Sequence, residues 1–127
     1  MGGHVDRLLF IRTIGSLRVL VEVARAFLRQ SAPWRTALDK SSNPFDAREL
    51  SVLVHKMKGS CYAVAAFGIA ETLKLAEASL PQMTQATWMP KSVELKNLIT
   101  EVEVELAAVI LFSESGSLPD SSCSELQ

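Results

Sequence analysis

The sequence predicts an all-α protein, an antiparallel four-helix bundle with a short additional helix at its N-terminus. Apolar residues recur every three or four positions along most of the chain, which is the spacing of one buried stripe on an α-helix. The 127 residues, 48% of them hydrophobic, are enough for one packed core and too few for two ordinary domains. Glycine and proline are sparse, at six and five residues, so short loops are expected between the helices.

The first part of the bundle is expected between Val5 and Asp39. A short leading helix begins at Val5 and ends near the pair Gly15-Ser16. A longer helix follows, whose apolar stripe comprises Leu17, Leu20, Val21, Ala24 and Leu28. Pro33 either kinks this helix or starts a new one, because proline lacks a backbone donor, and helical structure is expected to about Asp39.

The next helix begins at a start signal in the loop after Ser42. Asn43 is the expected N-cap, Pro44 occupies the first helical position and Asp46 lies in the first turn. The helix is expected to run about five turns. Its apolar face comprises Leu50, Leu53, Val54, Met57, Cys61 and Val64.

Two further helices complete the predicted bundle. The first places Ile69, Leu73, Ala76 and Leu80 inward and stops at Pro81. Residues 81–90 are expected to form a connector, and Ser92 is a candidate cap for the last helix. The inward residues of that helix are Leu95, Leu98, Ile99, Val102, Leu106 and Val109.

Composition places the domain at residues 5–112. Residues 1–4 are expected to be a tag or a disordered start, and residues 113–127, rich in serine and acidic residues, a disordered tail. Thirteen basic and fourteen acidic residues leave a formal charge of −1, which disfavours charge-driven binding to nucleic acid or to a membrane. No stretch approaches the about 20 apolar residues of a membrane span.

The two cysteines, Cys61 and Cys123, are too few for a disulfide framework and belong to no close cluster that would hold zinc. A cytoplasmic location and no metal site are therefore expected. The chain also lacks a P-loop and a G-x-G-x-x-G motif, so no cofactor of its own is expected.

His55 is the candidate reactive residue. At about 100° per residue it lies about 140° from Leu50, the centre of the buried stripe, and so points to solvent. An exposed neutral imidazole has one ring nitrogen with a free lone pair and is a competent nucleophile. Lys56 and Lys58 stand on either side of it and would attract an anionic phosphoryl group.

Three neighbours of His55 suggest that a partner approaches this face. Gly59, one turn later, costs about 1 kcal/mol in a helix interior and clears space beside the imidazole. Val52 and Tyr62 are exposed apolar or half-apolar residues on which a partner could pack. A surface histidine with no role and a glycine that allows close helix packing would fit the same angular pattern.

The segment His55-Lys56-Met57-Lys58-Gly59 resembles the H-x-x-K-G signature of histidine-containing phosphotransfer (HPt) domains of bacterial phosphorelays. In that family the signature lies on a central helix of a four-helix bundle, and the similarity in length and topology extends over residues 5–112. The chain departs from the family pattern at Ala65, where members often have glycine, and at Tyr62, where they have a small residue.

The resemblance implies a relay intermediate. His55 would accept a phosphoryl group on Nε2 from the phospho-aspartate of a receiver domain and pass it to the aspartate of a response regulator. Lys58, with Lys56 as a secondary contributor, would neutralise the phosphoryl oxygens, and the Mg²⁺ would belong to the partner receiver domain. No kinase or ATPase activity is implied.

Two organisations and one rival function stay open. The chain is either a free-standing relay protein or the C-terminal module of a hybrid sensor histidine kinase, in which case it belongs to the cytoplasmic portion of an inner-membrane protein. The rival is a helical adaptor or dimerisation module that has lost phosphotransfer, since Val52 and Tyr62 would serve it equally well.

Overall fold

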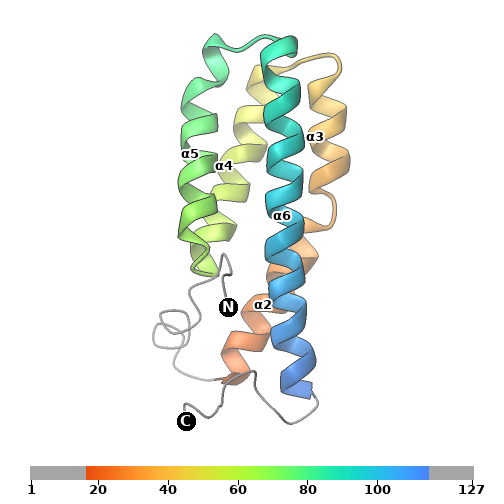
Figure 1. The fold of residues 1–127 in the computed structure, drawn as a ribbon, viewed down its shortest axis with the longest axis vertical. Helices are drawn as coiled ribbons and strands as arrows, with labels where there is room; N and C mark the ends of the chain where they lie inside the picture. The colour runs from red at the N-terminus through yellow and green to blue at the C-terminus, as the bar shows by residue number, and fades with distance from the viewer. Residues whose placement is uncertain (1–16, 115–127) are drawn as a thin grey trace.

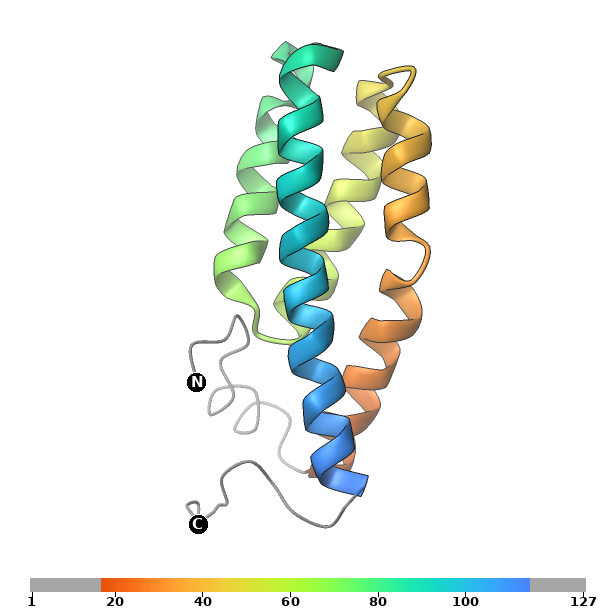
Figure 2. The same ribbon diagram turned by 45° about the vertical axis from the view of Figure 1, so that its right-hand side comes forward.

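The computed structural model describes residues 17–114, which form an all-α bundle (Figure 1). Its helices are α2 (Leu17–Ser31), α3 (Trp34–Ser42), α4 (Ala47–Ala63), α5 (Phe67–Ser79) and α6 (Gln85–Glu114), with a short 3₁₀ turn, η1 (Leu80–Gln82), after α5. Because α2 and α3 follow one another end to end as one interrupted member, the described chain is a four-helix bundle, as predicted (Figure 2). The predicted leading helix and the segment 1–4 lie outside the described residues, as does the predicted tail at 113–127, except for Ser113 and Glu114, which end α6.

One continuous apolar core holds the helices together. The predicted inward residues of α4, α5 and α6 are buried, except that Leu53 and Leu98 are partly buried against the core. Trp34 and Leu38, which continue the helical register after Pro33, are buried as well, and so is Trp88, which the apolar stripes did not include. Within the described residues no helix is both long and apolar enough to cross a membrane.

The order of the helices around the bundle places α4 and α6 at opposite corners. α4 packs mainly against α5 and α3, whereas α6 packs mainly against α2 and α3. In Figures 1 and 2, α6 lies in front and α4 behind. The outer faces of α4 and α6 are therefore directed to opposite sides of the molecule.

Pro33 starts a new helix, which settles the two alternatives left by the sequence. α2 ends at Ser31, Pro33 is the N-cap residue of α3, and helical structure extends to Ser42. Ser31 is fully buried and donates a hydrogen bond to Glu103 of α6, and Arg35 forms an ion pair with the same carboxylate. The Glu103 carboxylate therefore contacts residues on both sides of the break between α2 and α3.

The predicted start of α4 is wrong by several residues. Asn43 is the C-cap of α3, the Asn43-Pro44 bond is cis, and α4 begins only at Ala47. The N-cap is Asp46, whose Oδ1 accepts the backbone N–H of Glu49 at 3.1 Å. A carboxylate in this position satisfies an amide that has no partner within the helix, so Asp46 replaces Asn43 in the capping role.

The predicted connector at residues 81–90 is also wrong in its second half. α6 begins at Gln85 and includes Pro90, so Ser92 is not a cap but a buried residue within the helix. Trp88 accounts for the early start, because its indole is fully buried and its Nε1–H donates to Ser42 Oγ at 2.6 Å. Burial of so large a side chain stabilises the first turns, although Pro90 lacks one backbone donor.

Candidate functional site

His55 lies on the outer face of α4, as the sequence predicted. Its side chain is 67% exposed, while Val54 and Met57 on the same helix are fully buried. The apolar stripe of α4 is therefore anchored in the core, and the helix holds the imidazole at a fixed position on the surface.

A carboxylate from the neighbouring helix joins His55 and Lys58. Glu77 of α5 places Oε2 at 3.1 Å from Nδ1 of His55 and Oε1 at 3.0 Å from Nζ of Lys58. The side chains of Glu77 and Lys58 are only 25% and 21% exposed, so this ion pair is partly shielded from solvent. His55, Lys58 and Glu77 thus form one hydrogen-bonded triad on the surface between α4 and α5.

The charge state of Glu77 determines which ring nitrogen of His55 carries the proton. Partial burial would raise the pKa of Glu77, but the hydrogen bonds and charges of Lys58 and His55 outweigh it and lower this pKa below its ordinary 4.5. Near neutral pH the carboxylate is ionised and can only accept, so Nδ1 of His55 must be the donor. The lone pair of a neutral imidazole then lies on Nε2, the nitrogen that does not face Glu77.

The turn between α4 and α5 sets the register of this triad. His55 and Glu77 each lie eleven residues from Ala66, and antiparallel helices joined by a tight turn bring such residues together. Ala65 has a positive φ of 59°. At the end of α4 the backbone N–H groups of Ala65 and Ala66 donate hydrogen bonds to the carbonyls of Tyr62 and Cys61, respectively. This is a Schellman ending, with alanine at the left-handed position where glycine is usual.

The remaining predicted residues surround His55 on the same helix. Val52 is 57% exposed, Gly59 is exposed, and a Cβ added at Gly59 would meet no atom within 4 Å. Lys56 is exposed on the other side of α4, where it lines a groove with Pro33 and Leu53. The structure therefore brings Lys58 to the Glu77 carboxylate beside His55, whereas Lys56 faces α3.

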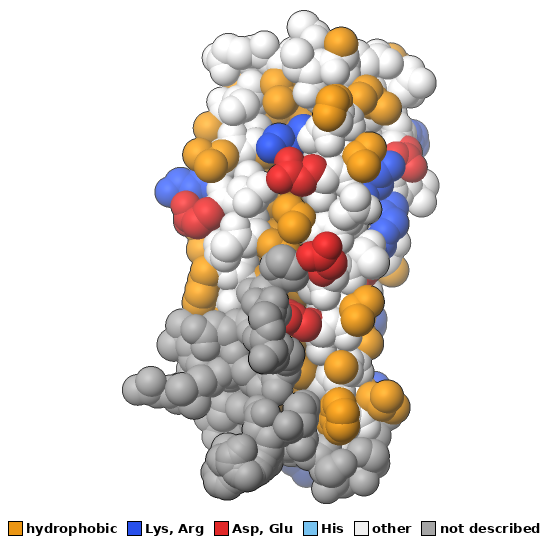
Figure 3. Space-filling view, in the orientation of Figure 1, with side chains coloured by type: hydrophobic (Ala, Val, Ile, Leu, Met, Phe, Trp, Pro, Cys, Tyr) orange, Lys and Arg blue, Asp and Glu red, His pale blue; other side chains and the backbone are white. Residues whose placement is uncertain are grey.

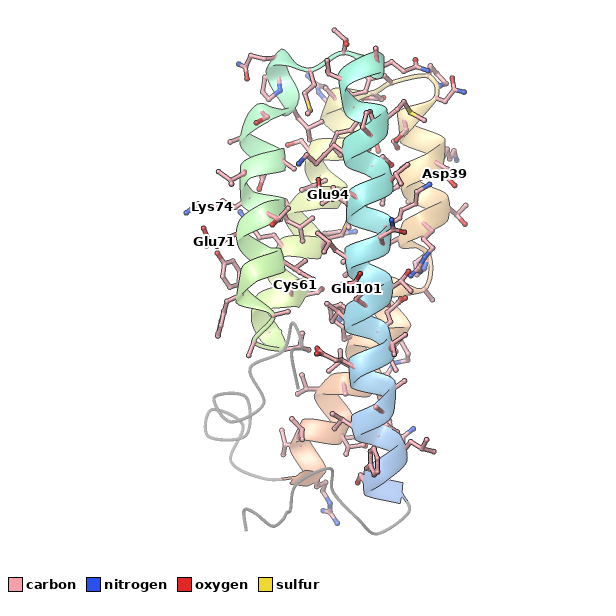
Figure 4. The ribbon with its side chains drawn as sticks, viewed as in Figure 1. Asp39, Cys61, Glu71, Lys74, Glu94 and Glu101 are labelled. Carbon is pink, nitrogen blue, oxygen red and sulfur yellow. The ribbon has the colours of Figure 1, made fainter. Side chains whose placement is uncertain are left out.

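Tyr62 is less available than the sequence suggested. It is 39% exposed, its ring lies against Phe67 with centroids 6.2 Å apart, and its hydroxyl donates to Glu71 Oε2 at 2.7 Å. That hydrogen bond, with smaller contributions from burial and the charge of Glu71, raises the pKa of Tyr62 above its ordinary 10.0. Figure 4 shows Glu71 at the outer edge of α5.

Other reactive groups of the described chain show no site of their own. Cys61 is fully buried (Figure 4), and burial raises the pKa of its thiol to about 12, so it packs in the core and is unreactive. Residues 17–114 contain no group of three or more His, Cys, Asp or Glu side chains arranged to hold a metal ion.

Glu77 is the residue that sequence reasoning missed. Motif spacing along a single helix cannot identify it, because its link to His55 crosses from α5 to α4. The usable signal was its distance from the turn, which equals that of His55, but the turn itself had no glycine to mark it.

No protein-family model, curated protein or solved structure matches the chain.

Proposed function

We propose that this chain is a phosphorelay intermediate in two-component signal transduction, with His55 as the phosphoryl acceptor. The observation that supports it most is the hydrogen bond from Nδ1 of the exposed His55 to Glu77, which leaves Nε2 as the nucleophilic nitrogen. A surface histidine without a role needs no ionised carboxylate to orient it.

In the proposed transfer, the lone pair of His55 Nε2 attacks the phosphorus of a receiver's aspartyl phosphate. The N–P bond forms, the P–O bond to the aspartate breaks, and the aspartate leaves as a carboxylate. The ring then carries a positive charge with its proton on Nδ1, and Glu77 stabilises that charge at 3.1 Å. The reverse sequence on a second receiver returns the phosphoryl group to an aspartate.

Lys58 would assist through its charge. Its Nζ is 3.0 Å from Glu77, so it is already held beside the imidazole and can exchange this contact for the incoming phosphoryl oxygens. Lys56 would contribute only long-range attraction from the α3 side of α4. Val52, Gly59 and Tyr62 would form the surrounding contact surface for the receiver.

The partners of the reaction are receiver domains of a hybrid kinase and of a response regulator. A receiver domain would supply the Mg²⁺ with its own acidic residues, and that ion would offset negative charge on the phosphoryl group. The chain would work in the cytoplasm, either alone or as the cytoplasmic end of a hybrid sensor kinase.

The decisive experiment incubates the protein with radiolabelled receiver domains that have been charged with acetyl phosphate. The wild type should acquire label that is labile in acid and stable in alkali, as expected of a phosphoramidate. His55→Gln should acquire none, while His4→Gln, which removes the second of the two histidines, should be labelled like the wild type. If the receivers of the source organism leave the wild type unlabelled, the adaptor function is favoured and this proposal is wrong.

A further inference from the structure

Tyr62 is a surface side chain that two residues of α5 hold in place. Its hydroxyl donates to Glu71 Oε2 at 2.7 Å, and its ring lies against Phe67 with the two ring planes inclined by 47°. The side chains of Tyr62 and Phe67 are each 39% exposed. Figure 3 shows hydrophobic side chains along the outer edge of α5, where Figure 4 labels Glu71. Contacts on both its ring and its hydroxyl therefore restrict Tyr62 to one orientation.

Tyr62 lies on the same face of α4 as His55. Seven residues separate the two, which is about two helical turns and returns the side chain to within about 20° of the same direction. Gly59 lies between them on this face, and a Cβ there would meet no atom within 4 Å. The open space at Gly59 is therefore bounded by the imidazole at one end and, about 4.5 Å further along the helix axis, by the tyrosine at the other.

A receiver domain that reaches His55 must also cover Tyr62. A stable protein interface buries about 800 Å² on each partner, which corresponds to a patch about 30 Å across. Tyr62 is about 10 Å from His55 along α4, so it lies inside such a patch but too far from Nε2 to touch the transferred phosphoryl group. A side chain already held in one orientation loses little conformational entropy on binding, and tyrosine is enriched among the residues that dominate interface energies.

Shape and apolar area, rather than charge, distinguish partners at Tyr62. Glu71 is acidic, but Lys74 lies three residues later at the same edge of α5 (Figure 4), close enough for the two charges to offset each other. The exposed part of the tyrosine ring is then best covered by an apolar side chain. A charged side chain placed against it would lose water without gaining a partner of opposite charge.

We propose that Tyr62, positioned by Glu71 and Phe67, determines which receiver domains this chain accepts. The inference rests on the proposed phosphotransfer at His55. Receivers that present an apolar side chain opposite Tyr62 dock well, whereas receivers that present a charged or bulky one dock poorly, because the held ring does not move aside. Specificity is a difference of affinities, and this contact supplies such a difference without taking part in the chemistry.

Single-turnover labelling at increasing concentrations of each charged receiver separates docking from chemistry. For the receiver of the source organism that labels the wild type best, Tyr62→Ala should raise the half-saturating concentration about tenfold and leave the limiting rate within about twofold. For poorly accepted receivers, Tyr62→Ala should leave this concentration unchanged or lower it, so the preference narrows. The control is Val104→Ala on α6, which removes apolar area from a residue 64% exposed at the opposite corner of the bundle and should behave like the wild type.

Substitutions of Glu71 test the positioning of the ring. Glu71→Ala removes the hydrogen bond and keeps the ring, so the half-saturating concentration of the preferred receiver should rise about threefold. Glu71→Gln removes the same charge but retains an oxygen that accepts the tyrosine hydroxyl, and it should behave like the wild type. Circular dichroism of each variant checks that the bundle remains folded; if Tyr62→Ala unfolds, the two Glu71 variants still decide the question.

The outcomes distinguish this inference from the function on which it rests. Equal changes for every receiver, or a lower limiting rate at an unchanged half-saturating concentration, would overturn the role of Tyr62 and leave phosphotransfer at His55 intact. Equal effects of Glu71→Ala and Glu71→Gln would overturn the positioning role of Glu71. A wild type that no receiver labels would overturn the proposed function, and this inference with it.

Discussion

Substitution of Gly59 separates the stability of the bundle from access to His55. Gly59 lies within α4, and a Cβ at this position meets no atom within 4 Å. A methyl group added there therefore clashes with no neighbouring element and gains the helix propensity that glycine lacks. For Gly59→Ala we expect the free energy of unfolding to rise by about 1 kcal/mol and the Tm by about 4 °C, with a smaller rise for Gly59→Gln.

Phosphotransfer should respond in the opposite direction. Gly59 is one turn from His55, so the longer side chain of Gly59→Gln occupies the space through which a receiver must reach Nε2. Rates of labelling from a charged receiver should fall about tenfold or more, because small displacements of reacting groups are costly. Gly59→Ala, with a shorter side chain, should lie between the wild type and Gly59→Gln.

Gly68 provides the matched control for both measurements. It lies in the first turn of α5, and a Cβ there also meets no atom within 4 Å. Gly68→Gln should leave labelling unchanged, with at most a small gain in stability. A loss of stability in Gly59→Ala would refute the reasoning from open space, and an unchanged labelling rate in Gly59→Gln would refute the reasoning from access.

Three other predictions concern single contacts. The pKa of Glu77 is lowered in the folded state, so its ionised form stabilises the fold above pH 4.5, and this stabilisation is lost as pH falls through the folded-state pKa. The Tm values of the wild type and of Glu77→Gln should therefore converge in acid. Tyr62 is the one tyrosine of the chain, and Glu71→Ala should lower the pH at which its phenolate absorbance appears, toward 10.0. Trp88→Phe should cost about 2 kcal/mol in urea unfolding, because it leaves a void and removes the hydrogen bond to Ser42; a loss below about 0.5 kcal/mol would contradict this account.

The bundle and the exposure of His55 could be predicted because both follow from helical periodicity. The stripe through Leu50, Met57 and Cys61 determines which way α4 faces, and that alone places His55 on the surface. The helix starts were harder. Asn43 and Asp46 are both good capping residues, and only the backbone path decides which of them accepts an amide of α4.

The start of α6 and the role of Glu77 depend on contacts between distant segments. Pro90 predicts a break when only neighbours in sequence are considered, and the opposing effect is the burial of Trp88 against α3. Glu77 resembles any other charged residue of a half-exposed helix until α5 is placed beside α4. Local patterns therefore identified the exposed histidine, but not the Glu77 carboxylate that is hydrogen-bonded to it.

The short connection at Ala65 and Ala66 has a consequence for any chain of similar sequence. One extra residue in this connection, if α5 absorbed it, would turn that helix by about 100° and move it about 1.5 Å along its axis. Glu77 would then point away from His55, although every residue of the triad would still be present in the sequence. Loop length between the second and third members of the bundle is thus a better criterion than the H-x-x-K-G motif alone for deciding whether a related chain keeps an oriented histidine.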